Sequence, residues 1–296
     1  MRNTLTFLIL CFLISCVAKQ QSPIDSITPQ SIHAEVEWLA SDDMKGRYYR
    51  SKEGRLAAKY IAHKWISAGL SPLPNKTSMY LPTDDMRDSP NVAGMLQGTG
   101  DEYVLITAHY DHLAPKRNGK DTIYNGADDN ASGTAALIEI AKVLGNQQQR
   151  YRASIVLVAF TGEEAGLVGS EHFVKSAPIP IHKIKALINL DMISRGDPNT
   201  IFLEGAPDAP RIALALSNAN KQIGLNIIRD KHPDWLYRSD QLPFLEQEVP
   251  AVFLSVEDHE DYHRVTDHTD KIIPELAAKT TKLTLLAALE LAHPVP

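Results

Sequence analysis

Histidine, carboxylate and tyrosine side chains follow short apolar runs at four places in the sequence. Continuously apolar runs of this length are typical of central strands that are buried on both faces of a sheet. The residues that follow them can bind a metal or move a proton. The runs are "YVLITA" (103–108) before His109 and Asp111, "SIVLVAF" (154–160) before Glu163 and Glu164, "ALINL" (186–190) before Asp191, and "AVFLS" (251–255) before Tyr262 and His263.

A further acidic cluster lies in the loop "NGADDNASG" (125–133), which precedes a helical pattern, "TAALIEIAKVL". Asp, Asn and Ser are good helix caps, so capping alone would explain this loop. In an open α/β sheet, however, ligands bind beyond the carboxyl ends of the strands, and this helix should begin at the same edge. We therefore expect Asp129 to join the side chains that follow the four strands.

The donor set favours two metal ions over one. Catalytic zinc accepts imidazole and carboxylate ligands and keeps an open position for water. Two metals about 3.5–4 Å apart, sharing one carboxylate, would accommodate more protein ligands than a single catalytic zinc. Calcium is disfavoured by the imidazoles. The candidate ligands are His109, Asp129, Glu164, Asp191 and His263.

The order of the predicted elements indicates an α/β fold. Helical patterns lie between or after the apolar runs, at 134–144, about 208–223 and about 274–292, and two more precede them, one ending at Gly69. Such alternation predicts a central, largely parallel sheet flanked by helices. We expect residues 71–90, which are rich in proline, to form a loop.

Bulk composition is that of a globular protein. The 296 residues are 44% hydrophobic and 22% charged, with a formal net charge of −6 and no basic run. This balance argues against nucleic acid or an anionic membrane surface as a partner.

The first residues form a leader of their own. In "MRNTLTFLILCFLISC", Arg2 precedes an apolar run that is too short to span a bilayer and suits a signal peptide. Its end resembles the lipobox of bacterial lipoproteins, which implies cleavage before Cys16, lipidation of that residue and, with Val17 next, an outer-membrane or periplasmic location. We expect a signal peptide at 1–15 and a polar tether at 16–30. The only cysteines are Cys11 and Cys16, so no disulfide is expected in the mature chain.

Five ordered motifs resemble the two-zinc aminopeptidases of peptidase clan MH, relatives of aminopeptidase Y, glutamate carboxypeptidase II, transferrin receptor and glutaminyl cyclase. The motifs are "AHYDHL", "NGADDNASG", "FTGEEAGLVGS", "INLDM" and "DYHRVTDHTD". The resemblance covers about residues 31–292 and implies a single zinc aminopeptidase domain over 31–296. Its implied cofactors are two zinc ions, and its implied substrates are peptides with a free amino terminus.

The resemblance also implies a role for each candidate. Asp129 would bridge the zinc ions and be followed by a cis peptide bond. Glu164 and His263 would bind one ion, and His109 and Asp191 the other. Glu163 would be the general base for a water that bridges the metals. Tyr262 would either donate to the oxyanion, as in some family members, or serve in packing. Because residues i and i+2 of a strand face the same way, we also expect Asp111 to reach His109 and orient it. Asp128 and Asn130 would shape the loop and Ser132 would cap the next helix.

Three histidines near these motifs, His112, His259 and His268, are not placed in the site. Two positions depart from the family pattern: Gln241 stands where His is common, and Glu248 where Gly is usual. Neither is a presumed ligand, but we expect both to affect the substrate pocket. The acidic run that contains Glu257, Asp258, Glu260 and Asp261 would suit a cationic amino terminus.

Two other functions stay open. The motifs "FTGEEAG" and "SDQLPFL" are compatible with glutaminyl cyclase, although intact "HYD" and "DYH" and the loop at 125–133 resemble a two-zinc peptidase more closely. A non-catalytic surface binding protein is the other alternative, but such a protein should have lost ligands.

Overall fold

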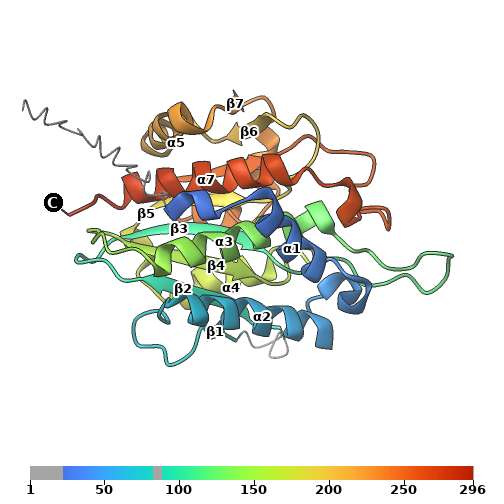
Figure 1. Cartoon of the computed structure of the whole chain (residues 1–296). Helices are drawn as coiled ribbons and strands as arrows, with labels where there is room; N and C mark the ends of the chain where they lie inside the picture. The colour runs from blue at the N-terminus through green and yellow to red at the C-terminus, as the bar shows by residue number, and fades with distance from the viewer. Residues whose placement is uncertain (1–22, 83–88, 296) are drawn as a thin grey trace, which may run out of the picture.

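A mixed eight-stranded sheet runs through the centre of the molecule (Figure 1). The computed structural model describes residues 23–82 and 89–295. The strands lie side by side in the order β1-β2-β4-β3-β5-β8-β6-β7. Their bounds are β1 Tyr80–Leu81, β2 Asn91–Leu96, β3 Tyr103–His109, β4 Ser154–Phe160, β5 Ile184–Leu190, β6 Thr200–Glu204, β7 Asn226–Arg229 and β8 Ala251–Ser255.

The four central strands are parallel to one another. β3 pairs in parallel with β4 and β5, and β5 with β8. Towards the edges, β2 pairs antiparallel with β4, β1 with β2, and β6 with β8, whereas β6 and β7 are parallel. The predicted fold class, a largely parallel mixed sheet in one α/β domain, is confirmed.

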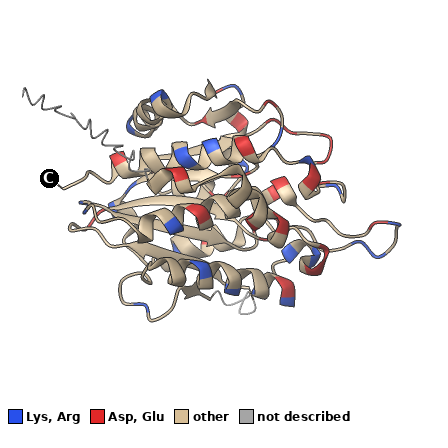
Figure 2. Ribbon diagram, viewed as in Figure 1, with Lys and Arg blue, Asp and Glu red and all other residues tan. Residues whose placement is uncertain are grey.

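Helices cover both faces of this sheet, and both basic and acidic residues lie along them (Figure 2). Their bounds are α1 Pro29–Leu39, α2 Lys52–Ala68, α3 Gly133–Gly145, α4 Val168–Ser176, α5 Pro210–Ile223, α6 Leu242–Leu245 and α7 Pro274–Leu291. Short 3₁₀ turns are η1 Pro23–Ser26, η2 Asp42–Arg47, η4 Ile181–Lys183, η5 Pro233–Tyr237 and η6 Thr269–Lys271, and η3 Ala127–Ser132 is a π-helical segment.

Alternate residues of the central strands enter two separate cores. In β3, Val104 and Ile106 pack with residues of α1, α2, α3, α5 and α7 on one face. Leu105 packs on the other face, in a cluster with Phe173 of α4 and Phe244 of α6. Burial on both faces is the physical reason that this strand is apolar without alternation.

The sequence predicted the long elements and missed the shorter ones. The four apolar runs are β3, β4, β5 and β8, and α2 ends at Gly69, whose left-handed φ of 94° forms the expected cap. Strands β1, β2, β6 and β7 and helices α4 and α6 were not predicted, and β1 lies within residues 71–90, which were expected to form a loop. Residues 23–30, assigned to the tether, belong to the fold, since Ile27 is fully buried and α1 begins at Pro29.

The predicted leader, its predicted cleavage site and Cys16 lie outside the described residues. Within 23–82 and 89–295, no helix combines the length and the hydropathy that crossing a bilayer would require.

Candidate metal centre

The carboxyl ends of four adjacent parallel strands bring the candidate side chains to one edge of the sheet. His109 is the last residue of β3, and Asp191 directly follows β5. Glu163 and Glu164 come after β4, and His263 lies in the loop after β8. Because these strands are neighbours, side chains that are far apart in the sequence converge at this edge.

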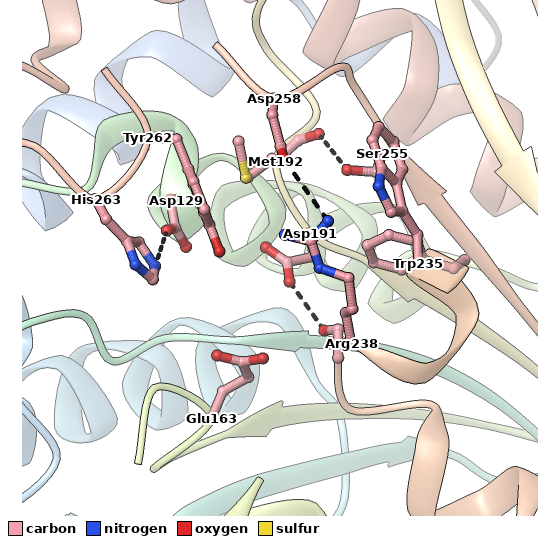
Figure 3. Close-up of a pocket in the computed structure, with 12 residues that line it drawn as sticks. Asp129, Glu163, Asp191, Met192, Trp235, Arg238, Ser255, Asp258, Tyr262 and His263 are labelled. Atoms are coloured by element: carbon pink, nitrogen blue, oxygen red, sulfur yellow. Dashed lines mark hydrogen bonds and ion pairs between the residues drawn. The ribbon is translucent and has the colours of Figure 1, made fainter. Parts of the chain in front are cut away.

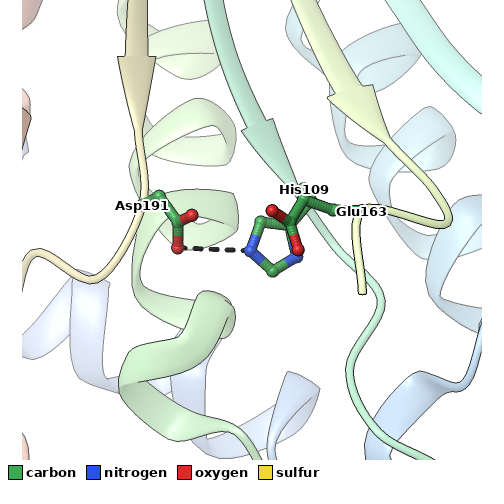
Figure 4. Close-up of side chains that lie close together, drawn as sticks. All are labelled: His109, Glu163 and Asp191. Carbon is green, nitrogen blue, oxygen red and sulfur yellow. Dashed lines mark hydrogen bonds and ion pairs between the residues drawn. The ribbon is translucent and has the colours of Figure 1, made fainter. Parts of the chain in front are cut away.

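One group of metal-capable side chains consists of His109, Glu163 and Asp191 (Figure 4). One ligand atom of each lies within 4.8 Å of the others. The Nε2 atom of His109 is 3.2 Å from Oδ1 of Asp191. Carboxylates and an imidazole at these separations can surround a cation.

A second group consists of His112, Asp129 and Glu164, whose ligand atoms also lie within 4.8 Å of one another. His263 joins it, because its Nε2 atom is 3.2 Å from Oδ2 of Asp129 and 3.1 Å from Oε2 of Glu164. The structure thus brings Glu164 and His263 together in one group, which is the pairing that the resemblance implied.

Asp129 stands between the two groups. Its Oδ1 atom is 3.5 Å from Nε2 of His109, and its Oδ2 atom faces His263 and lies 3.6 Å from Nδ1 of His112. The peptide bond after it, Asp129–Asn130, is cis, as expected. Each carboxylate oxygen therefore points to a different group, which is the arrangement that a bridging ligand needs.

The residues present fit metal ions on physical grounds. The Oδ2 atom of Asp129 is buried without a hydrogen-bond partner among the described residues. Burying such a group unpaired is costly, and several carboxylates this close repel one another. A divalent cation in the group of His112, Asp129 and Glu164 would give this oxygen a partner, and a cation in either group would offset the negative charge.

The acidic loop is fixed by hydrogen bonds from three directions. The backbone N–H groups of Asp128 and Asp129 donate to the carboxylate of Asp267. The carboxylate of Asp128 accepts from the backbone and the hydroxyl of Ser194, at 2.7 and 2.6 Å. Asn130 donates to the carbonyl of Leu190. Asp128 and Asn130 shape the loop, as expected.

Ser132 does not cap the helix that follows. Its hydroxyl donates to the carbonyl of Asp128 and accepts from the N–H of Ile193. The side-chain oxygen of Asn130 accepts from the N–H of Gly133 at 2.9 Å instead. The loop therefore uses Ser132 to join its own backbone to the segment after β5.

Asp111 lies behind His109, but its carboxylate is not the nearest partner of the imidazole. The Nδ1 atom of His109 is 3.0 Å from the backbone carbonyl of Asp111 and 3.8 Å from its Oδ1 atom. That Oδ1 atom accepts instead from the N–H of Glu163. Asp111 lies two residues beyond His109, the last residue of β3, so the strand alternation used to place it no longer applies there.

A pocket opens over both groups (Figure 3). Glu163 and Tyr262 reach it from opposite sides, and Trp235 and Phe253 also line it. Burial raises the pKa of Glu163 well above its usual range, although His109 opposes this shift. Burial likewise raises the pKa of the Tyr262 hydroxyl, so Tyr262 stays a proton donor near neutral pH.

Tyr262 is held against the predicted ligand beside it. Its ring stacks on that of His263, with centroids 4.0 Å apart. The hydroxyl thus lines a pocket that also contains Asp129, Asp191 and Glu163.

His112 is the functional candidate that the sequence analysis left out. It is fully buried, and its Nδ1 atom is 2.6 Å from Oε1 of Glu164. Its spacing from His109 in "HYDH" was the available signal. The Nε2 atom of His259 approaches Oδ2 of Asp128 at 3.2 Å, and His268 pairs with Asp121 at 3.4 Å, so these two stay outside both groups.

Gln241 and Glu248, which depart from the family pattern, do not line the pocket. Gln241 is buried, accepts from Asn189 and donates to the carbonyls of Trp235 and Leu236, so it acts on the pocket through the turn that carries Trp235. Glu248 has a φ of 60°, a left-handed conformation that explains why glycine is usual there.

Most of the acidic run is already paired. Asp261 is buried with Arg195 and Lys271, and Glu257 pairs with Lys231 and His232. Of the run, Asp258 alone lines the pocket among the described residues, 3.6 Å from Arg238. The negative charge expected around the substrate's amino terminus therefore comes from Asp258 and from the carboxylates of the two groups.

The fold and this centre define a class of protein, and comparison with known proteins identifies it. A model of peptidase family M28 matches residues 91–288, and the chain belongs to this family. A curated relative, a probable zinc metalloprotease of Pyrenophora teres f. teres, is 29% identical over 204 residues, covering 66% of this chain and 39% of the relative. The chain spans 39–56% of the length of the first three curated relatives.

Solved structures share the fold at low sequence identity. The LapA aminopeptidase of Legionella pneumophila superposes with a TM-score of 0.77 at 21% identity, covering 93% of this chain and 74% of that one. The glutaminyl cyclase of Porphyromonas gingivalis gives a TM-score of 0.71 at 18% identity, covering 89% and 98%. Similarity to both means that the fold alone does not separate the two activities.

Proposed function

We propose that this protein is a zinc-dependent aminopeptidase that uses two zinc ions. The observation that carries the proposal is the position of Asp129, with one carboxylate oxygen towards each of the two metal-capable groups beneath a single pocket. Membership of peptidase family M28 and the similarity to a probable zinc metalloprotease and to the LapA aminopeptidase support the same conclusion.

The proposed ligands follow from this arrangement. His109 and Asp191 hold one ion, Glu164 and His263 hold the other, and Asp129 bridges them. Bound zinc supplies Lewis acidity towards the scissile carbonyl and lowers the pKa of a water. His112 contacts Glu164 and orients that carboxylate.

Glu163 is the proposed general base. It lines the pocket and, as a carboxylate with a raised pKa, can accept a proton from water and pass it to the leaving amine. Tyr262, on the other side of the pocket, donates a hydrogen bond to the oxyanion that forms on the substrate. Asp258 and the carboxylates of the centre attract the free α-amino group.

The test is an assay of the folded domain, residues 23–296, with zinc added. Substrates are amino-acyl amides, dipeptidyl amides and a peptide with an amino-terminal glutamine. In Glu163→Gln we expect kcat to fall by about 10²–10⁴-fold because the base is lost. The same variant should still bind two zinc ions, which metal analysis would measure.

Other outcomes would revise the proposal. Ammonia release from the glutamine peptide without amide hydrolysis would indicate a cyclase. No activity on any substrate, with both ions bound, would indicate a binding protein. One zinc per chain would remove the two-metal centre.

We also propose that the protein is exported and anchored to the cell envelope by a lipid on Cys16. The lipobox-like end of the leader supports this. Cys16→Ser should release the protein from the membrane fraction, and a variant that stays with the membrane would refute the anchor. Cys11→Ser is the matched control, because Cys11 lies inside the leader and should leave the anchor intact.

A further inference from the structure

Arg47 is fully buried, and its guanidinium is surrounded by backbone carbonyls. Its Nε atom donates to Tyr110 at 2.8 Å, and its Nη2 atom to Gly126 at 3.0 Å. Its Nη1 atom donates to both Leu39 and Asn125 at 2.7 Å. A planar guanidinium can serve several acceptors in fixed directions, which a lysine ammonium cannot do.

These carbonyls belong to the segments that present the candidate ligands. Tyr110 lies between His109 and Asp111, two residues before His112. Asn125 and Gly126 begin the acidic loop that carries Asp129. One side chain therefore ties together the segment after β3, the loop before α3 and, through Leu39, the end of α1.

The backbone around Arg47 is shaped to make this approach. Lys45, Gly46 and Arg47 are consecutive left-handed residues, with φ of 44°, 74° and 53°. This backbone conformation is unfavourable for residues with a side chain, so contacts elsewhere must hold Lys45 and Arg47 in it. A methyl group on Gly46 would come within 2.3 Å of the carbonyl oxygen of Leu113 and 2.7 Å of that of Tyr124. The turn therefore packs tightly between the segment that follows β3 and the segment that leads into the acidic loop.

In the described part of the chain, no carboxylate forms an ion pair with the guanidinium of Arg47. Burial lowers its pKa to about 10, while Asp129 and Asp111 counteract this shift. The guanidinium therefore stays cationic at neutral pH. Its positive charge, placed behind the carboxylates of the centre, reduces their mutual repulsion when no metal is bound.

We propose that Arg47 is a positioning residue, which holds the segment 110–112 and the loop 125–129 in the metal-binding arrangement before a metal binds. This rests on the proposed zinc centre. Metal affinity then depends on the four directed hydrogen bonds of Arg47 as well as on the ligands. Such partners of ligand segments typically change metal affinity by about 10- to 100-fold.

The experiment compares Arg47→Lys, Arg47→Ala and wild type. Zinc affinity is measured by competition with a chelator, and amide hydrogen exchange is measured in the metal-free protein. We expect 10- to 100-fold weaker zinc binding in both variants, with faster exchange at 110–113 and 125–130. Millimolar guanidinium should partly restore zinc affinity in Arg47→Ala, because the small cation can occupy the vacated space.

Met44→Ala is the matched control. Met44 is buried in the same turn, and its side chain makes no hydrogen bond in the described structure, so it should lower stability without changing zinc affinity. Wild-type affinity and exchange in Arg47→Lys would overturn the proposal, as would an equal loss of affinity in Met44→Ala. If the wild type binds no zinc, the proposed function fails, while the exchange experiment still tests Arg47.

Discussion

At the centre, His112 contacts Glu164 through its Nδ1 atom, and Asp111 contacts His109 through its backbone carbonyl. Both residues lie in the loop after β3, where side chains no longer alternate as they do in a strand. Sequence spacing therefore did not show that His112 contacts Glu164, or that the carbonyl of Asp111 faces His109. Arg47 was missed because its partners are backbone carbonyls in distant segments, which the types of the neighbouring residues do not reveal.

The Tyr262 hydroxyl has a testable role at this scale. In Tyr262→Phe we expect kcat to fall by about 10²–10³-fold with little change in KM, because the hydroxyl would act on the oxyanion and not on the ground state. Steady-state kinetics on an amino-acyl amide measures both constants. Tyr237→Phe is the control, since Tyr237 is 62% exposed. An unchanged kcat in Tyr262→Phe would limit Tyr262 to packing on His263.

At the scale of elements, strand continuity made the centre predictable. β3, β4 and β8 are buried along their whole length, and β5 is buried except at Lys185, so each contains an apolar run whose end is visible in the sequence. β7, in contrast, lies at the edge, and none of its residues is buried. Its pattern, "NIIR", is too short and too polar to be recognised. The candidate ligands lie at ends of central strands, and this is why they could be found.

Three helices meet at one buried carboxylate, which predicts a pH dependence of stability. Glu35 of α1 accepts from Tyr60 and Lys64 of α2 and from Lys142 of α3. Burial would raise the pKa of Glu35, but these partners outweigh it and the pKa is lowered. Since the folded pKa lies below the unfolded one, the stabilisation is complete above about pH 4.5. It is lost as the pH falls through the lowered value.

Glu35→Gln should therefore lower the free energy of unfolding at pH 7 by about 1–2 kcal/mol. The difference from wild type should shrink as the pH falls below about 4.5. Urea unfolding at several pH values measures it. Glu37→Gln, an exposed position on the same helix, is the control and should differ from wild type by less than about 0.5 kcal/mol. A difference for Glu35→Gln that is constant with pH would contradict this account.

For the whole molecule, metal binding should be coupled to folding. The centre joins segments from β3, β4, β5, the acidic loop and the loop after β8, and only the folded chain assembles them. A ligand present at about 1,000 times its Kd adds about 4 kcal/mol per site. We therefore expect chelation to lower Tm markedly and zinc to restore it.

Asp129→Asn should abolish most of that zinc-dependent change in Tm, because Asp129 faces both groups. Differential scanning calorimetry with and without zinc makes the measurement. His268→Ala is the control, since His268 pairs with Asp121 and belongs to neither group. A full zinc response in Asp129→Asn would mean that Asp129 is not shared between the ions.

The contacts of the acidic loop have a consequence for the order in which the protein is made. The backbone of Asp128 and Asp129 is held by Asp267, and the imidazole of His263 contacts both Asp129 and Glu164. A ribosome has synthesised every strand of the sheet before it reaches either residue. A nascent chain can therefore build its scaffold early, yet it acquires a complete centre only near the end of translation. Prematurely terminated chains should lack it.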